Sequence, residues 1–184
     1  MKITIQNKTL LAAVKKLLPI CPKNAFLPVL ENLHLRALED GKLHLTASDA
    51  ELTATICINN AFPTVVCGEV LINAKKLADI LSALPQDAHI CITCNHQEHT
   101  ATITTGKNDS AAYKMPADDV SLYPAAQHLE QGAFNNPFIL IPAQILKKGL
   151  AATAYATGKD EMRPAMTGVC LQLMSDKTVM VATD

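Results

Sequence analysis

The sequence predicts an α+β fold built from one repeated arrangement: a strand, a helix and three further strands. Two observations predict it. Segments with helical hydrophobic spacing follow short strand-like segments three times, and each helix is followed by further strand-like segments with turn residues between them. A third observation is the regular spacing of Ile5, Ile72 and Ile141, which end the first strands and lie 67 and 69 residues apart.

The first repeat begins with a predicted strand at residues 2–5 and a helix at 7–18. Leucine and valine side chains fall on one face of this helix, Asn7 is expected to cap its N-terminus, and Pro19 ends it. An Asp40-Gly41 turn indicates a hairpin between two of the later strands. These three strands are predicted at residues 33–37, 42–47 and 51–58.

The second and third repeats follow the same order. The second has a strand at 69–72, a helix at 73–84 that Pro85 ends, and strands at 89–93, 99–104 and 110–115. The third has a strand at 138–141, a helix at 142–156, and strands at 168–173 and 178–182 around a turn at Ser175-Asp176-Lys177.

Two repeats make a compact domain, so we expect one domain at residues 1–125 and the first half of a second at 126–184. Residues 118–137 are predicted to form the linker. Because the third repeat stops before its last strand, the sequence predicts a piece of a longer protein.

Composition excludes several classes of protein. The 184 residues are 49% hydrophobic and 18% charged, which is typical of a globular chain. No segment approaches the roughly 18 apolar residues of a membrane span, and polar residues interrupt the first eight positions before a signal peptide could form. Six cysteines without a secretory signal indicate free thiols in a reducing compartment, so we expect a cytoplasmic protein without membrane contact.

Charge is distributed unevenly along the chain. The three predicted helices contain seven lysines and one aspartate, a net charge of +6, whereas the rest of the chain has nine basic and sixteen acidic residues. The lysines are predicted opposite or beside the apolar faces. Lysines on the wet face of a single helix are unremarkable, but exposed faces usually mix both signs. Three such helices predict a basic face that attracts phosphates without reading bases.

Several segments, in order along the whole chain, resemble the bacterial sliding clamp, the beta subunit of DNA polymerase III. The segments that carry the resemblance are Leu27-Pro28-Val29-Leu30-Glu31-Asn32-Leu33, Asp40-Gly41-Lys42-Leu43-His44-Leu45-Thr46-Ala47-Ser48-Asp49, Ile72-Asn73-Ala74-Lys75-Lys76-Leu77-Ala78-Asp79-Ile80, Met115-Pro116-Ala117-Asp118-Asp119 and Val181-Ala182-Thr183-Asp184. The resemblance implies the DNA-clamp fold, with sheets outside and helices lining a hole around duplex DNA. It also implies a homodimeric ring of three-domain subunits, the third domain being absent here.

The function implied is that of a processivity factor, which encircles duplex DNA and tethers the replicative polymerase. Its expected partners are double-stranded DNA, contacted at the phosphate backbone, and the polymerase and clamp loader, bound through short peptide motifs. We expect no catalysis and no cofactor. Candidate DNA contacts are Lys8, Lys15, Lys16, Lys23, Asn24, Lys75, Lys147, Lys148 and Arg163.

Two further surfaces are implied by the resemblance. The candidate dimer-interface residues are Lys76, Ile80, Leu84, Lys107, Ser110 and Ala112, where Ser110 and Ala112 replace the bulky apolar residues usual in the family. Alternatively, Ile80 and Leu84 belong to the core of their own domain. Met166 and Thr183 would form part of the pocket for partner peptides; its next segment lies beyond Asp184.

The alternative hypothesis is a small zinc-dependent binding module or enzyme. Cys91, Cys94, His96 and His99 offer four zinc-type ligands within nine residues. Cys91 and Cys94 are three apart on a predicted strand, however, so their side chains should point to opposite faces. No nucleophile-elbow, P-loop or dinucleotide-binding motif occurs in the chain, which weakens an enzymatic interpretation.

Overall fold

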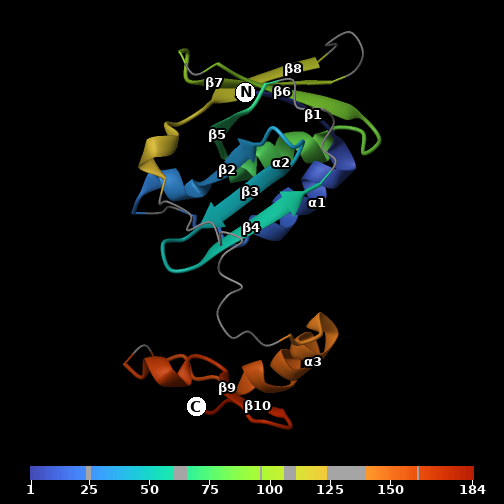
Figure 1. Cartoon of the computed structure of the whole chain (residues 1–184). Helices are drawn as coiled ribbons and strands as arrows, with labels where there is room; N and C mark the ends of the chain where they lie inside the picture. The colour runs from blue at the N-terminus through green and yellow to red at the C-terminus, as the bar shows by residue number, and fades with distance from the viewer. Residues whose placement is uncertain (24–25, 60–65, 96, 106–110, 124–139, 161) are drawn as a thin grey trace. The chain divides into compact units, whose positions relative to one another are not determined.

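Two sheets, each completed by a strand from the other repeat, form the N-terminal part of the computed structural model (Figure 1). The structure describes residues 1–23, 26–59, 66–95, 97–105, 111–123, 140–160 and 162–184. The chain divides into an N-terminal unit, Met1–His128, and a C-terminal unit, Leu129–Asp184. No helix in these described ranges is both long and apolar enough to cross a membrane.

Strand exchange joins the first two repeats. One antiparallel sheet has the order β1-β6-β7-β8, and the other has the order β4-β3-β2-β5. The first sheet consists of β1 (Lys2–Gln6), β6 (His89–Asn95), β7 (Thr100–Thr105) and β8 (Ala111–Pro116). The second consists of β2 (Asn32–Ala37), β3 (Leu43–Ser48), β4 (Thr53–Ile58) and β5 (Gly68–Asn73). The first strand of each repeat therefore pairs with the second strand of the other, with Ile5 opposite Ile90 and Ile72 opposite Leu33.

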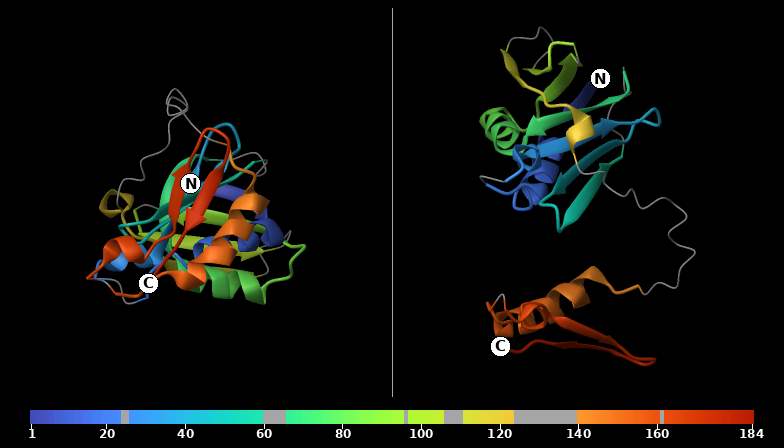
Figure 2. Two further views of the ribbon diagram at one scale, coloured as in Figure 1. Left: turned by 90° about the horizontal axis from the view of Figure 1, so that it is seen from below. Right: turned by 90° about the vertical axis from the view of Figure 1, so that its left-hand side faces the viewer.

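The helices α1 (Asn7–Leu17) and α2 (Ala74–Ala83) lie side by side, as Figures 1 and 2 both show. Their apolar faces are buried in one core with the inward-facing residues of both sheets. The predicted helices and strands of the first two repeats are confirmed to within a few residues. Burial at every second position of β1, β6 and β7, and at every third or fourth position of the helices, explains much of this agreement, because that burial produces the sequence pattern.

Asn7 does not cap α1, contrary to the prediction. Gln6 is the capping residue, without a side-chain hydrogen bond, and Asn7 is the first helical residue. The buried Asn7 amide Nδ2 instead donates to the carbonyl oxygens of Leu81, Leu84 and Pro85, at 3.0, 3.1 and 3.0 Å. These carbonyls at the end of α2 lack helical partners, so a polar side chain from α1 satisfies them. The start of α1 therefore lies against the end of α2, and the two helices are antiparallel.

The start of the predicted linker, residues 118–123, belongs to the folded N-terminal unit, contrary to the prediction. Asp118 N donates to Leu71 O on β5, and a short 3₁₀ helix, η2 (Val120–Leu122), leads to the buried Tyr123. The Tyr123 ring lies 5.7 Å from that of His34 on β2. Residues 118–123 are thus packed on the N-terminal unit. The remainder of the predicted linker, residues 124–137, lies outside the described residues.

In its described residues, 140–160 and 162–184, the C-terminal unit has one α-helix packed on one hairpin. Helix α3 (Ala143–Thr153) continues into a 3₁₀ turn, η4 (Ala154–Ala156), and lies along the hairpin of β9 (Cys170–Leu173) and β10 (Thr178–Val181), as Figure 2 shows in orange and red. Gly149 permits this approach, because a Cβ there would overlap the thioether of Met180. Between the helix and hairpin runs another 3₁₀ turn, η5 (Pro164–Met166).

The strand predicted at 138–141 is wrong where it can be judged. Residues 138 and 139 lie outside the described part of the chain, and Leu140 and Ile141 are not in a strand. In the N-terminal unit, the first strand of each repeat pairs with a strand of the other repeat. The third repeat has no such partner repeat within these 184 residues. A short apolar segment without a pairing partner gains no ladder hydrogen bonds, which is why the pattern of residues 138–141 misleads here.

Candidate nucleic-acid interface

Five lysines lie on the exposed faces of α1 and α2. Leu10, Val14 and Leu77 on the opposite faces are almost fully buried, so the helical period turns the lysines outward. The exposed residues are Lys8, Lys15, Lys16, Lys75 and Lys76. The predicted wet-face positions of these lysines are therefore confirmed.

The antiparallel arrangement gathers four of these lysines. Lys15 and Lys16 are in the last turn of α1, and Lys75 and Lys76 are in the first turn of α2. Because the start of α1 contacts the end of α2, the last turn of α1 lies at the same end of the helix pair as the first turn of α2. We call Lys15, Lys16, Lys75 and Lys76 the lysine group.

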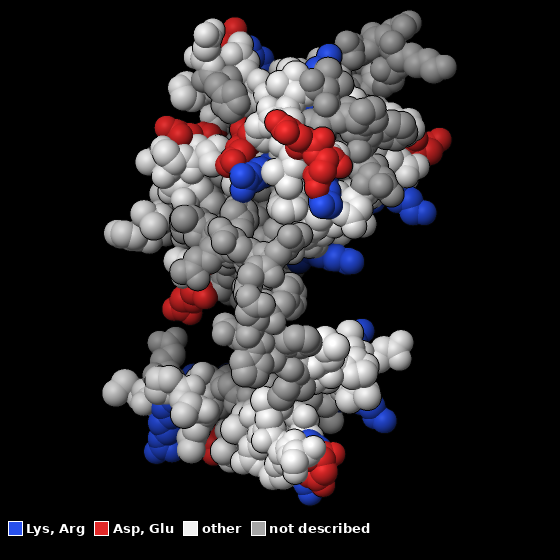
Figure 3. Space-filling model, viewed as in Figure 1, with Lys and Arg blue, Asp and Glu red and all other residues white. Residues whose placement is uncertain are grey.

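The lysine group has no acidic partners among the described residues. The ion pairs of the N-terminal unit involve other basic groups, such as Arg36 with Glu69 and Lys114 with Glu98. On the face of this unit shown in Figure 3, basic and acidic side chains lie beside one another. The helix lysines thus differ from the paired cations of the sheets. They form no ion pair in the described part of the chain, although Asp79 lies one turn from Lys75 and Lys76, and their ammonium groups remain available to an anionic ligand.

Helix polarity opposes Lys75 and Lys76. Amide N–H groups give the start of a helix a partial positive charge, so cations are unfavourable there and favourable at the end. Lys15 and Lys16 suit the last turn of α1, but α2 has no acidic residue in its first turn. Asn73 caps α2 by accepting a hydrogen bond from Lys76 N at 3.0 Å. Helix stability therefore does not explain Lys75 and Lys76. Contact with a phosphate would explain Lys75, whereas Lys76 is a candidate dimer residue.

The other candidate DNA contacts are more dispersed. Lys23 is exposed after α1, and Asn24 lies outside the described residues. In the C-terminal unit, Lys147 and Lys148 are exposed on α3. Arg163 is exposed just before η5, with its Nε 3.8 Å from Asp160 Oδ2. This long ion pair leaves most of the guanidinium accessible.

The structure brings only some of the candidate dimer-interface residues together. Lys76 and Ile80 on α2 line a hollow of about 300 Å³ with Asp79 and the end of β8, which pairs only with β7 and therefore has one free edge. Ala112 is exposed on β8, and Leu84 is only 9% exposed and belongs to the core. Ile80 is partly buried against that core. Lys107 and Ser110 lie outside the described residues.

The two candidate peptide-pocket residues lie near each other in the C-terminal unit. Met166 in η5 is half-buried, and its carbonyl accepts a hydrogen bond from Gly158 N at 2.8 Å. A Cβ on Gly158 would lie 3.6 Å from both the Met166 side chain and Asp184 Cα. The chain end that contains the exposed Thr183 therefore lies beside η5.

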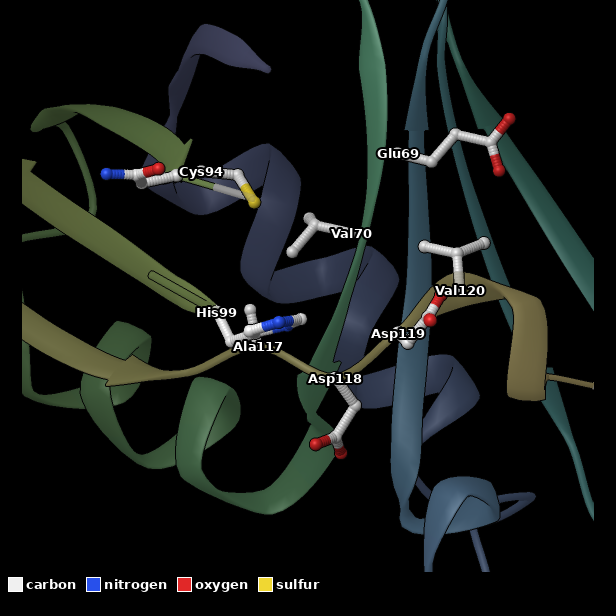
Figure 4. Close-up of a pocket in the computed structure, with 9 residues that line it drawn as sticks. Glu69, Val70, Cys94, His99, Ala117, Asp118, Asp119 and Val120 are labelled. Carbon is white, nitrogen blue, oxygen red and sulfur yellow. The ribbon is translucent and has the colours of Figure 1, made fainter. Parts of the chain in front are cut away.

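The cysteine and histidine cluster does not assemble as the alternative hypothesis requires. Cys94 and His99 line a pocket of about 380 Å³, shown in Figure 4, with Glu69, Asp118 and Asp119. Cys91 is not in its lining; its sulfur lies 3.8 Å from Thr93 Oγ1 on the other face of β6. The strand period separates the two thiols, as predicted. Across the described residues, no three His, Cys, Asp or Glu side chains are arranged to hold a metal ion, and His96 is outside them.

The pKa shifts of Cys94 and Asp119 in this pocket differ from those expected at a site with a nucleophilic cysteine. Burial raises the pKa of the Cys94 thiol, so the neutral form is favoured at neutral pH. Backbone and side-chain hydrogen bonds from Ser121 lower the pKa of the Asp119 carboxyl. A protonated thiol is a poor nucleophile, so this environment does not activate Cys94 for nucleophilic chemistry.

Comparison with solved structures identifies the class of fold. The model superposes on the DNA polymerase sliding clamp from Bacillus subtilis with a TM-score of 0.87 and 25% sequence identity, covering all of this chain and 47% of that one. The beta subunit of the DNA polymerase from Streptococcus pyogenes gives a TM-score of 0.85, with 26% identity and the same coverage. The fold is that of a sliding clamp.

Sequence comparisons define the family more narrowly. Residues 1–126 match the model of the DNA polymerase III beta subunit, N-terminal domain. The beta sliding clamp of Synechococcus elongatus is 30% identical over 176 residues, which are 96% of this chain and 44% of that protein. That of Streptomyces coelicolor is 27% identical over all 184 residues and 45% of its own length. The chain belongs to the DNA polymerase III beta-subunit family and spans about half the length of these relatives.

Proposed function

We propose that the chain forms part of a DNA sliding clamp, a non-catalytic factor that encircles duplex DNA and tethers the replicative polymerase. In this proposal, the N-terminal unit is the first clamp domain and the C-terminal unit is the first half of the second. The exposed lysines on helices from three successive repeats are the observation that carries the proposal. Relatives named as beta sliding clamps support it.

The lysines would act on DNA by loose electrostatic attraction. Lysine side chains are flexible point charges that contact phosphates without selecting a base sequence. Such contacts release counterions and weaken steeply as salt rises. A surface of this kind holds a duplex while permitting it to slide, which is what a processivity factor requires. Dimerisation through α2 and β8, and peptide binding near Met166 and Thr183, belong to the same proposal.

The test is reversal of charge in the lysine group. We expect Lys15→Glu with Lys16→Glu to lower affinity for a blunt DNA duplex about ten-fold or more at low salt, as measured by fluorescence anisotropy. The free energy of unfolding should fall by no more than about 2 kcal/mol, because both side chains are exposed and the loss comes only from placing two acids in the last turn of α1, where cations are favoured.

The matched control reverses two exposed lysines outside the helices, Lys2 on β1 and Lys177 in the turn between β9 and β10. This control variant changes the net charge by the same amount as the Lys15/Lys16 variant, but it should lower the affinity for DNA less. Equal losses in the two double variants would mean that overall charge, and not the helix surface, governs binding. A large loss of stability in the Lys15/Lys16 variant would assign these lysines a structural role.

A further inference from the structure

Phe26 is the most exposed large apolar residue of the described chain. Its side chain is 99% exposed, and that of the following Leu27 is 49% exposed. The two residues lie between α1 and η1, the 3₁₀ helix Pro28–Glu31. A phenyl ring fully in water contributes nothing to the core and carries the cost of hydrating an apolar surface. The fold therefore leaves the Phe26 ring fully available to a partner.

The location of Phe26 connects it with the lysine group. Pro28, two residues later, lines a hollow of about 210 Å³ with Asn73 and Lys76 at the first turn of α2. On its other side, the chain leaves the last turn of α1, which contains Lys15 and Lys16, and passes the exposed Lys23. Phe26 therefore lies in the segment between the last turn of α1 and the hollow at the first turn of α2, close to the lysine-bearing end of the helix pair.

The combination of ring and cations favours one kind of partner. A purely apolar protein groove would gain nothing from the nearby lysines, whereas a nucleic acid offers both phosphates and base faces. Aromatic side chains beside a basic surface bind unpaired bases by stacking. Inside a duplex both faces of every base are covered, and inserting a ring requires unstacking. An unpaired base has a free face and avoids that cost.

We infer that Phe26 stacks on an unpaired DNA base at a junction where the duplex contacted by the lysine group continues as a single strand. This inference rests on the proposed function, which supplies the duplex. Phe26 would add a preference for duplex ends with a single-stranded extension, and the lysines would provide the affinity common to all duplexes.

A fluorescent substitution tests the contact directly. The chain contains no tryptophan, so Phe26→Trp introduces a single indole at this position. We expect its fluorescence to be quenched by a duplex with a single-stranded extension, and much less by the same duplex with blunt ends. Leu52→Trp is the matched control: Leu52 is 54% exposed, in the turn between β3 and β4 beside Asp49 and Glu51. Its indole should not distinguish the two DNAs.

Binding by the Phe26 variants tests the energetic role. Phe26→Ala should lower affinity for the extended duplex about five-fold or more, the range of one base–aromatic stack, and leave blunt-duplex affinity unchanged. Phe26→Tyr should retain the preference, whereas Phe26→Leu, which is apolar but not aromatic, should lose it. Circular dichroism would verify that each variant is folded.

The outcomes separate this inference from the proposed function. If Lys15→Glu with Lys16→Glu lowers blunt-duplex affinity but the Phe26→Trp indole responds equally to both DNAs, stacking is wrong and the proposed function stands. If Phe26→Ala lowered the affinity for the extended duplex and for the blunt duplex equally, the stacking inference would also be wrong. If neither DNA binds the unmodified chain, or the lysine variant binds both normally, the proposed function fails and this inference fails with it.

Discussion

Asn7 shows how one polar side chain determines the arrangement on which the candidate DNA surface depends. Its amide contacts three carbonyls at the end of α2, while its own Oδ1 has no hydrogen-bond partner within the described part of the structure. A buried amide in this position favours the antiparallel packing of α1 and α2. The lysine group exists because that packing brings the two lysine-bearing turns to one end.

Asn7→Ala should therefore lower the free energy of unfolding by about 1–3 kcal/mol, because buried carbonyls lose their donor. Asn7→Asp should cost more, since a carboxylate would face the same carbonyls. Urea unfolding with an unchanged m-value would measure both. The control is Asn73→Ala, which removes a surface cap and should cost about 1 kcal/mol. If Asn7→Ala costs less than this control, the role assigned to Asn7 is wrong.

The buried Cys21 thiol and Tyr123 phenol predict how the free energy of unfolding changes at alkaline pH. Burial raises the pKa of the Cys21 thiol from 9.0 to about 11 and that of the Tyr123 phenol from 10.0 to about 12. The folded state thus holds both protons more tightly than the unfolded state. Their contribution to stability is complete below about pH 9 and decreases as pH rises towards 12.

The expected result is a free energy of unfolding that falls steadily between about pH 9 and 12, measured by urea titration at each pH. Tyr123→Phe should abolish the part of the decrease above about pH 10, and Cys21→Ala the part that begins near pH 9. An unchanged pH profile in both variants would show that other groups govern alkaline unfolding.

At the scale of single elements, the lysines in the first turn of α2 are expected to lower the stability of the helix while strengthening DNA binding. Lys75 and Lys76 have the unfavourable sign for a helix N-terminus. We expect Lys75→Glu to raise the free energy of unfolding by about 0.3–1 kcal/mol and to weaken duplex binding at the same time. Thermal unfolding and anisotropy on the same sample would measure the two effects.

Lys75→Gln is the control for this pair of effects, because it removes the charge without adding an acid. It should produce a smaller change of the same sign in both measurements. Loss of stability in Lys75→Glu would indicate that Lys75 supports the fold. Unchanged DNA binding would remove it from the candidate interface.

For the whole molecule, the repeats determine how many helices contribute to DNA binding. Lys147 and Lys148 on α3 are exposed, and α3 belongs to a separate compact unit. We expect Lys147→Glu with Lys148→Glu to lower duplex affinity and to reduce the slope of log affinity against log salt by about two, since each phosphate contact contributes about 0.9. Anisotropy titrations over a series of salt concentrations would measure the slope.

The same titration with Lys177→Glu, a lysine in the hairpin turn of the C-terminal unit, provides the control. Its salt slope should change less than that of the α3 variant. An unchanged slope in the α3 variant would mean that the N-terminal unit alone contacts DNA.

The periodic segments of the sequence were sufficient for most of the fold. Leu10, Val14, Leu77 and Leu81 recur with helical spacing because one side of each helix is buried, and the strands alternate because one face of each sheet is. The same logic placed the lysines on the exposed helix faces and separated Cys91 from Cys94. These are local properties, in which the position along the chain determines the direction of the side chain.

Contacts between distant segments required the tertiary structure. The Asn7 amide contacts residues 74 to 78 positions later in the sequence, so local capping rules misassigned it. The apolar residues Leu140 and Ile141 form no strand, because strand formation depends on a partner and not on pattern alone. The gathering of the lysine group and the exposure of Phe26 beside it likewise follow from helix packing and chain path. Periodicity determines which way a side chain points, whereas only the folded chain determines what it meets.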